Sequence, residues 1–300
     1  MTKFFLLAIL LFITFSCSTH HRANIKANEK FIVELKKSST RGGAIETALQ
    51  GLLFGVNYLA EKSAKSLNSS YSQSISINDY YNTDLGKVEK TYEKIYIKKY
   101  SKPDNKEQKT IITQIVRDEF KGNIKSRGEE SALTLNEVIR DKEDDILNFQ
   151  AVIELISDPE NPGITKLSFN ELRILFSKTK VFKDEDLNAK VSLLIEGQWR
   201  DSEGTPHKKT LIEQVYDFKK LKYGYENQIK TPIVSPWYYD IPIYSDIEGA
   251  IKYGLINITI QLEEYEGNKS RYINKLPNIL DKNKKVIINQ GASSFNEILK

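Results

Sequence analysis

The chain has 300 residues, of which 40% are hydrophobic and 28% are charged. This composition is close to the average for globular proteins, and it argues against extended disorder, a collagen-like chain and a protein with several membrane spans. The formal net charge of +4 is too small for a nucleic-acid-binding surface. We therefore expect a folded protein with no nucleic-acid partner.

The first 16 residues have the features of a secretory signal peptide. Lys3 supplies a positive charge, residues 4–15 are apolar except for Thr14, and the small residue Ser16 follows them. A membrane span needs about 20 apolar residues, so this stretch is too short to cross a bilayer. We predict that residues 1–16 are removed on export.

Cys17, the single cysteine of the chain, comes directly after Ser16. A cysteine in this position resembles the lipobox of bacterial lipoproteins, although Thr14 and Phe15 stand where that pattern usually has leucine and a small residue. The resemblance implies that the thiol of Cys17 receives a diacylglycerol and that Cys17 becomes the acylated first residue of the mature protein. Each buried methylene contributes about 0.8 kcal/mol, so several acyl chains would hold the protein on a membrane.

The residues after Cys17 bear on the location of the protein. Ser18 stands where inner-membrane retention in some bacteria requires Asp, so the resemblance implies the outer membrane. Residues 19–22 are neutral to basic and lack the acidic cluster often seen in lipoproteins on the cell surface. We expect an outer-membrane lipoprotein that faces the periplasm, with residues 17–29 as a lipidated tether. The membrane is then its first partner, through the N-terminal lipid.

Residues 30–145 form the predicted N-terminal region, which begins with a strand at residues 31–35 and contains one long amphipathic helix. Over residues 44–67 the apolar side chains recur at intervals of three and four residues. This spacing is typical of a helix with one buried face. We expect the helix to pack against a sheet, with contact to a membrane or to a partner as the open alternatives.

The rest of this region gives weaker signals. Residues 68–78 are rich in Ser and Asn and predict a loop or a weak edge strand. The Tyr and Ile content of residues 88–100 favours a strand with a solvated face. The apolar residues 110–116 predict a buried strand, and residues 133–139 predict a strand or a short helix.

Residues 146–300 are predicted to form an antiparallel β-sandwich-like region with a C-terminal tail. Polar turns separate several short runs in which apolar and polar residues alternate, as they do in the half-buried strands of a sandwich. With the long helix of the N-terminal region, the predicted fold class is α+β and mainly β. The predicted strands lie at residues 147–155, 166–177, 191–199, 210–223 and 256–263.

Two of these strands carry more specific signals. The apolar phase changes between Phe169 and Leu172, and such a slip predicts a β-bulge. Residues 200–206 form a polar loop between two apolar runs, which predicts a hairpin whose second arm also fits a helix.

The chain offers little for catalysis or metal binding. It has no Gly-x-Ser-x-Gly motif, and Cys17 would be acylated. His207 is the only histidine outside the tether, and it lies in a polar loop. Residues 184–188 begin a calcium-loop pattern, but Ala189 replaces its glycine. We therefore assign no catalytic residue, no metal site and no cofactor, and we expect a protein that is not an enzyme.

The segment at residues 235–242 is the best candidate for recognition. Prolines bracket its three consecutive aromatic residues, Trp237, Tyr238 and Tyr239. Neighbouring side chains of an extended segment point to opposite sides, so at least one of these rings must face outward. An outward Trp or Tyr can bind an envelope protein or a glycan, and these are the expected partners of the segment.

The sequence thus predicts a lipid-anchored cell-envelope protein that acts by binding or as part of an assembly. Two alternatives stay open. One is an envelope hydrolase with paired carboxylates, which are recognised by their separation in space and not by sequence. The other is an accessory lipoprotein of an envelope-spanning secretion or transport machine.

The Cys17→Ala variant lacks the thiol that lipidation requires. We expect it to stay unprocessed or to leave the membrane fraction, because it cannot receive acyl chains. Cell fractionation and immunoblotting measure both effects. The matched control is Ser18→Ala, which should be processed and should fractionate as the wild type does. A Cys17→Ala protein found in membranes at the mature size would contradict lipidation.

Overall fold

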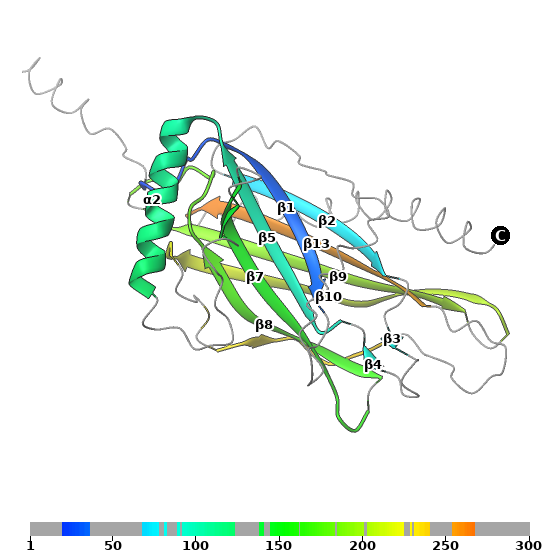
Figure 1. The fold of residues 1–300 in the computed structure, drawn as a ribbon. Helices are drawn as coiled ribbons and strands as arrows, with labels where there is room; N and C mark the ends of the chain where they lie inside the picture. The colour runs from blue at the N-terminus through cyan, green and yellow to red at the C-terminus, as the bar shows by residue number, and fades with distance from the viewer. Residues whose placement is uncertain are drawn as a thin grey trace, which may run out of the picture.

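The structure is a computed structural model that describes residues 20–36, 68–77, 81–82, 89–90, 92–123, 138–140, 145–161, 163–183, 185–200, 203–224, 229, 231–240 and 254–267. These residues form two antiparallel sheets packed face to face and one helix (Figure 1). The elements are β1 (Ala27–Lys36), β2 (Asn68–Ile77), β3 (Tyr81–Asn82), β4 (Glu89–Lys90), β5 (Lys94–Pro103), α2 (Lys106–Asn123), β6 (Ile139–Arg140), β7 (Asp145–Ser157), β8 (Ile164–Ile174), β9 (Leu187–Arg200), β10 (Pro206–Leu221), β11 (Ile233–Val234), β12 (Tyr238–Tyr239) and β13 (Gly254–Glu266).

The larger sheet has seven strands. Its main path is β1-β5-β7-β8-β11, while β6 pairs with β7 and β12 pairs with β8. The smaller sheet has the order β10-β9-β13-β2, and β3 and β4 form a separate short ladder. Strands β2 and β5, from the predicted N-terminal region, pair with β13 and β7 of the C-terminal region, and β1 pairs with β5. Both regions therefore contribute to one sandwich, and the prediction of a mainly β, antiparallel fold is confirmed.

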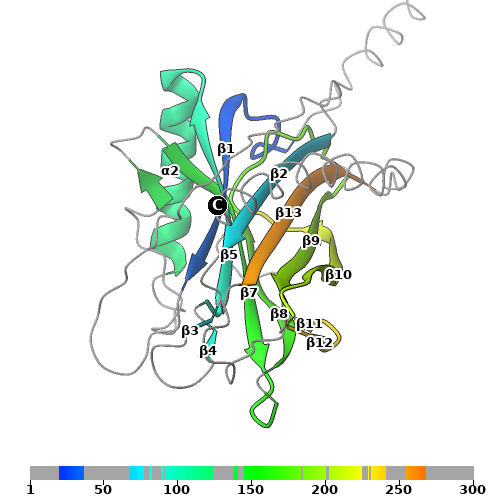
Figure 2. The ribbon, with the colours of Figure 1, turned by 90° about the vertical axis from the view of Figure 1, so that its right-hand side faces the viewer.

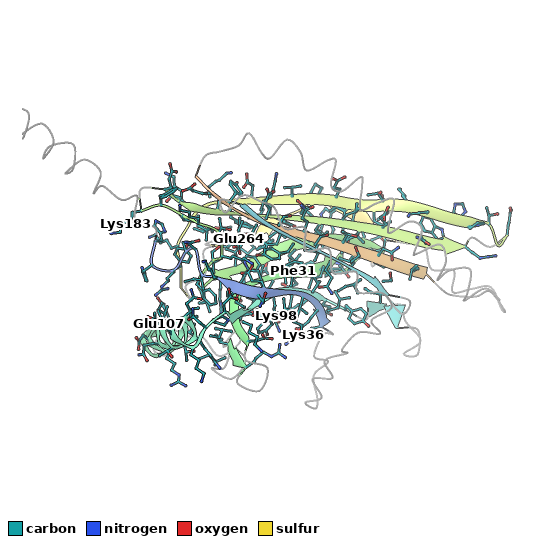
Figure 3. The ribbon with its side chains drawn as sticks, turned by 90° about the horizontal axis from the view of Figure 1, so that it is seen from above. Phe31, Lys36, Lys98, Glu107, Lys183 and Glu264 are labelled. Carbon is teal, nitrogen blue, oxygen red and sulfur yellow. The ribbon has the colours of Figure 1, made fainter. Side chains whose placement is uncertain are left out.

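The core lies between the two sheets because each strand sends every second side chain inward. On β13, Ile256, Ile258 and Ile260 are almost fully buried and join the same cluster as Phe31 of β1 and Phe149 of β7. Seen from above, the side chain of Phe31 lies between the layers (Figure 3). The alternation read from the sequence is therefore what fixes the inner face of each sheet.

The predicted β-bulge is also confirmed. In the β7–β8 ladder Val152 pairs with Glu171 and Ile153 pairs with Phe169, which leaves Asn170 as an extra residue on β8. The bulge lies where the apolar phase changes between Phe169 and Leu172. The predicted hairpin is formed by β9 and β10, so the helical alternative for its second arm is wrong.

The strand predicted at residues 110–116 is wrong, because these residues belong to α2. The amide N–H of Gln108 donates to Oδ1 of Asn105 over 2.8 Å, so Asn105 caps the first turn. Ile112 and Val116 lie four residues apart and are buried on one helical face. The cap at Asn105 favours a helix here. The buried apolar residues are also spaced four apart, as on one face of a helix, and the strand prediction did not take this spacing into account.

Helix α2 covers the face of the larger sheet that points away from the smaller sheet (Figure 2). It forms a second core there with Tyr100, Leu147 and Phe176. The amphipathic helix predicted over residues 44–67 lies outside the described residues, and so do most of residues 133–139 and the C-terminal tail after Gly267.

Residues 20–25, which we call the N-terminal segment, bind to the sandwich although they were predicted as tether. The N–H of Ile25 donates to the carbonyl of Ser177 over 3.1 Å, and Arg22 forms an ion pair with Glu119 of α2. The sandwich therefore begins three residues after Cys17.

Phe169 links the two sheets, since it is fully buried on β8 and its ring centroid lies 4.8 Å from those of Tyr216 and Phe218 on β10. We expect Phe169→Ala to lower the free energy of unfolding by about 3–5 kcal/mol, through lost burial and a residual cavity. Val215→Ala, at a 44% exposed side chain of β10, is the control and should change it by less than about 0.5 kcal/mol. Urea denaturation measures both, and equal losses would contradict this core.

Candidate functional site

Exposed apolar side chains gather on β11 and β12, the two short strands at the edge of the larger sheet. Ile233 and Val234 are 42% and 49% exposed, and Trp237 and Tyr239 are 47% and 71% exposed. We call these four residues the edge patch. Single exposed apolar residues are ordinary, but two on β11, Trp237 directly before β12 and Tyr239 on β12 lie along one sheet edge and together indicate an interaction surface.

Buried residues of the same segment hold the edge patch in place. Tyr238 is 6% exposed and belongs to the core. Ser235 exchanges two hydrogen bonds with the backbone of Leu167, at 2.8 and 2.9 Å. The hydroxyl of Thr165 donates to Oδ2 of Asp240 over 2.6 Å. The exposed rings are therefore carried on a backbone that is fixed on both sides.

The prediction that at least one aromatic residue of this segment faces outward is confirmed. Trp237 and Tyr239 are on the surface, whereas Tyr238 is in the core. Ile233 and Val234 were not predicted as part of this surface, although an apolar pair between two prolines is a visible signal in the sequence.

Two features limit how a partner can bind the edge patch. Pro232 and Pro236 are exposed and have no amide N–H, so a partner strand cannot extend the hydrogen-bond ladder along this segment. The ammonium of Lys166 lies 4.5 Å from the centroid of the Trp237 ring. A partner must therefore bind the edge patch through side-chain contacts, beside the positive charge of Lys166.

The edge patch lies toward the end of β8 that is farther from the N-terminal segment. β12 pairs with Ile164 and Thr165 at the start of β8, whereas Ile174 ends β8 close to Ser177, which binds the N-terminal segment. At about 3.3 Å per residue, Ile164 and Ile174 are about 33 Å apart along the strand. Figure 1 shows β8 crossing most of the length of the larger sheet.

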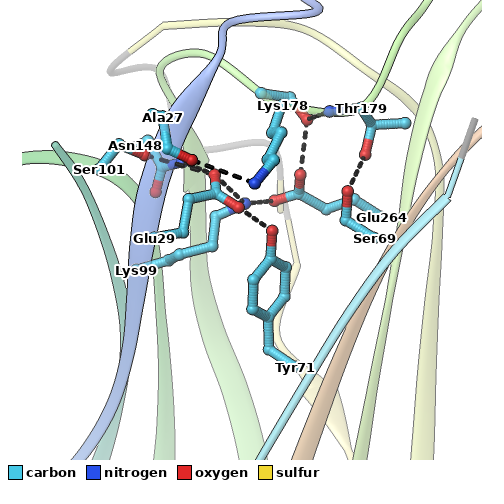
Figure 4. A network of polar contacts seen from close by, with 11 residues as sticks. Ala27, Glu29, Ser69, Tyr71, Lys99, Ser101, Asn148, Lys178, Thr179 and Glu264 are labelled. Atoms are coloured by element: carbon cyan, nitrogen blue, oxygen red, sulfur yellow. Dashed lines mark hydrogen bonds and ion pairs between the residues drawn. The ribbon is translucent and has the colours of Figure 1, made fainter. Parts of the chain in front are cut away.

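A second group of polar side chains lies inside the sandwich, near the N-terminal segment (Figure 4). Lys99 of β5 is fully buried, and its Nζ lies 2.5 Å from Oε1 of Glu264 on β13 and 3.4 Å from Oε1 of Glu29 on β1. We call Lys99, Glu29, Glu264 and Asn148 the buried ionic cluster. Because β5 and β13 belong to different sheets, this cluster joins the two layers.

Hydrogen bonds satisfy most of the carboxylate oxygens of the buried ionic cluster. Nδ2 of Asn148 donates to Oε1 of Glu29 over 2.9 Å, and the hydroxyl of Tyr71 donates to Oε2 of Glu29. The hydroxyl of Ser177 donates to Oε2 of Glu264 over 2.6 Å. Neutral hydrogen-bond donors and Lys99 together therefore offset the desolvation penalty of the two acids.

Two carboxyl groups share one ammonium ion in this cluster, and the pKa values of Glu29 and Lys99 reflect it. Burial raises the pKa of Glu29, and the nearby charge of Glu264 raises it further, while Lys99 acts in the opposite direction. Burial by itself lowers the pKa of Lys99, but the charges of Glu264 and Glu29 outweigh that effect and raise it. The cluster therefore favours the charged form of Lys99, while burial shifts Glu29 toward its protonated form.

The residues considered for metal binding or acid–base catalysis do not form a site in the structure. His207 stacks on Trp199 with 5.4 Å between ring centroids. His20 contacts the ring of Tyr223. Within the described ranges no three His, Cys, Asp or Glu side chains are placed to hold a metal ion. In the part of the chain that the structure describes, no helix has both the length and the apolar character of a membrane span. Cys17 lies outside the described residues.

Comparisons with protein-family models, with curated proteins and with solved structures found no match for this chain. A functional assignment must therefore be argued from its own residues, and the edge patch and the buried ionic cluster are the two features that support one.

Glu29→Gln tests the electrostatics of the buried ionic cluster. Because the folded-state pKa of Glu29 lies above its ordinary value of 4.5, its contribution to stability is complete below that value and is lost as pH rises through the folded-state pKa. The charged groups that face Glu29 are Lys99, Glu264 and Lys178. We expect the stability of the wild type relative to Glu29→Gln to be greatest below pH 4.5 and to fall as the pH rises above that value.

Urea denaturation at a series of pH values measures this difference. The control is Glu34→Gln on the same strand, where a 40% exposed carboxylate pairs with Lys98 over 2.7 Å. An ion pair with one exposed partner contributes little, so the control should shift stability by less than about 1 kcal/mol throughout. A relative stability that rises with pH at Glu29 would contradict the assigned protonation.

Proposed function

We propose that this chain is a lipid-anchored cell-envelope protein that binds another envelope protein through the edge patch and acts without catalysis. The observation that carries the proposal is the joint exposure of Ile233, Val234, Trp237 and Tyr239 on a segment held by buried residues. The signal peptide and the cysteine at residue 17 support export, lipidation and an outer-membrane position facing the periplasm.

The composition of the edge patch favours a protein over a glycan as the partner. Sugars stack on aromatic rings, but the aliphatic side chains of Ile233 and Val234 gain most from contact with an apolar protein surface. Trp and Tyr are also the residues that most often supply the binding energy of protein interfaces.

The position of the edge patch supports a partner in the periplasm. Two residues, Ser18 and Thr19, lie between Cys17 and His20, where the described chain begins, and the three steps from Cys17 to His20 span at most about 11 Å. A lipid on Cys17 would therefore keep the N-terminal segment close to the membrane. The edge patch lies toward the other end of β8, which favours a partner away from the lipid surface.

The hydrolase alternative receives less support. Glu29 and Glu264 are two carboxylates in one cluster, but their side chains are only 3% and 0% exposed. A polymeric substrate cannot reach acids that lie inside a sandwich. An accessory role in an envelope-spanning machine, by contrast, would use the edge patch in the same way as any other protein contact.

Within the aromatic segment, substitution of the buried ring should lower stability, whereas substitution of the exposed rings should leave stability unchanged. We expect Trp237→Ala and Tyr239→Ala to change the free energy of unfolding by less than about 0.5 kcal/mol, because both rings are exposed. Tyr238→Ala should lower it by about 3 kcal/mol or more, since that ring is in the core. Thermal and urea unfolding of the three variants measure this, and a loss of stability in all three would contradict the edge patch.

The binding role is tested by a photo-crosslinking side chain introduced at Tyr239 in intact cells. We expect a discrete protein adduct that weakens when Trp237→Ala is added, because a central interface aromatic contributes about 2 kcal/mol, roughly thirtyfold in affinity. The same side chain placed at Ile111, which is 50% exposed on α2, is the control. Adducts that are equal at the two sites, or that contain only glycan, would contradict the proposal.

A further inference from the structure

The buried ionic cluster brings an amine, a carboxamide and a carboxyl group together. Oε1 of Glu29 lies 3.4 Å from Nζ of Lys99 and 2.9 Å from Nδ2 of Asn148, so one oxygen contacts both nitrogen atoms (Figure 4). Lys99 pairs with Phe149 and Tyr100 pairs with Leu147, which leaves Asn148 as the extra residue of β7 beside Lys99. The two nitrogen-bearing side chains therefore come from adjacent positions of neighbouring strands.

We propose that Lys99 and Asn148 become joined by an intramolecular amide bond, formed with the help of Glu29 and Glu264. This bond would be a covalent modification of the chain itself, and it does not depend on the edge patch or its partner. It would connect β5 to β7 inside the larger sheet.

The reaction balances without any further reactant. The ammonium of Lys99 gives one proton to Glu264, whose Oε1 is 2.5 Å away, and the freed amine attacks Cγ of Asn148. The C–Nδ2 bond then breaks, and a second proton from the attacking nitrogen passes to the departing nitrogen through Glu29. Ammonia leaves, and the third hydrogen stays on the new amide. No oxidant, reductant or metal is needed.

Glu29 is placed to act as the acid in this step. Asn148 is fully buried, and its Oδ1 accepts no hydrogen bond from the described residues. A half-turn of the carboxamide brings Oδ1 to Oε1 of Glu29, where a protonated carboxyl can donate to it. Negative charge develops on Oδ1 during the attack, so this hydrogen bond stabilises the transition state. The raised pKa of Glu29 favours the protonated form that the step requires.

The surroundings favour the product. The side chains of Lys99 and Glu264 are 0% exposed, so the reactants bury an ion pair. In the product the amide and both acids are neutral, which removes the desolvation penalty of two buried charges. The ring of Tyr71 lies 4.7 Å from Nζ of Lys99 and helps to exclude water that would compete with the amine. Because the bond needs to form only once in each molecule, a slow reaction is sufficient.

Peptide mapping of the full-length protein, extracted from cells and digested with trypsin, tests the bond directly. We expect residues 99–106 to be linked to residues 143–166, with a mass lower than the sum of the two peptides by one ammonia. Fragmentation should place the link between Lys99 and Asn148. Recovery of residues 143–166 as an unlinked peptide from the folded protein, together with cleavage after Lys99, would overturn the proposal. A linked species lighter by one water would also overturn it, because that loss assigns the bond to a glutamate.

Variants test the roles of the neighbouring groups. Asn148→Ala and Glu29→Gln should both give only unlinked peptides, the first through loss of the acceptor and the second through loss of the acid. Lys178→Arg is the matched control, since Lys178 donates to the carbonyl of Ala27 and the substitution keeps its positive charge near Glu29, and it should keep the link. A link that persists in Glu29→Gln would overturn the role of Glu29. The wild-type map decides whether the bond exists even if a variant fails to fold.

Discussion

Until the proposed amide bond forms, the contact on which this end of the sandwich depends is the ion pair between Lys99 and Glu264, because it joins a strand of one sheet to a strand of the other with no exposed side-chain surface. A buried charge is costly unless its partner and its remaining hydrogen bonds are all in place. Strand β1 supplies Glu29, and the chain after β8 supplies Ser177. Both sheets and the connection after β8 must therefore be in register before the cluster is satisfied.

The same requirement ties the start of the folded chain to the interior. Ser177 donates its hydroxyl to Glu264, while its backbone is hydrogen bonded to the N-terminal segment at Arg22 and Ile25. The segment that would follow the proposed lipid thus helps to close the end of the sandwich over its charged interior. At the other end of β8 the interior is apolar and the surface carries the edge patch. The N-terminal segment and the edge patch therefore lie toward opposite ends of β8.

The spacing of apolar residues along the chain predicted much of the fold, but it did not predict the buried ionic cluster. The alternation in β13 and the phase change near Phe169 are properties of neighbouring residues, so the sequence reveals them. Helix α2 was mistaken for a strand because the apolar run was weighed without its cap at Asn105. The charged interior could not be anticipated, since Lys99 and Glu264 are 165 residues apart and a lysine that shares a strand face with Ile95 and Ile97 does not reveal its partner.

The aromatic segment shows what limits site prediction at the surface. Alternation requires that Trp237 and Tyr239 share a side opposite to Tyr238, but it does not say which side is outside. That choice is made by the pairing of Tyr238 with Thr165, whose hydroxyl is bound by the buried Asp240. A polar contact beneath the segment therefore decides which rings are exposed. The edge patch and the buried ionic cluster are alike in this respect, because in both a buried carboxyl group fixes the position of strands that the hydrophobic pattern alone would leave undetermined.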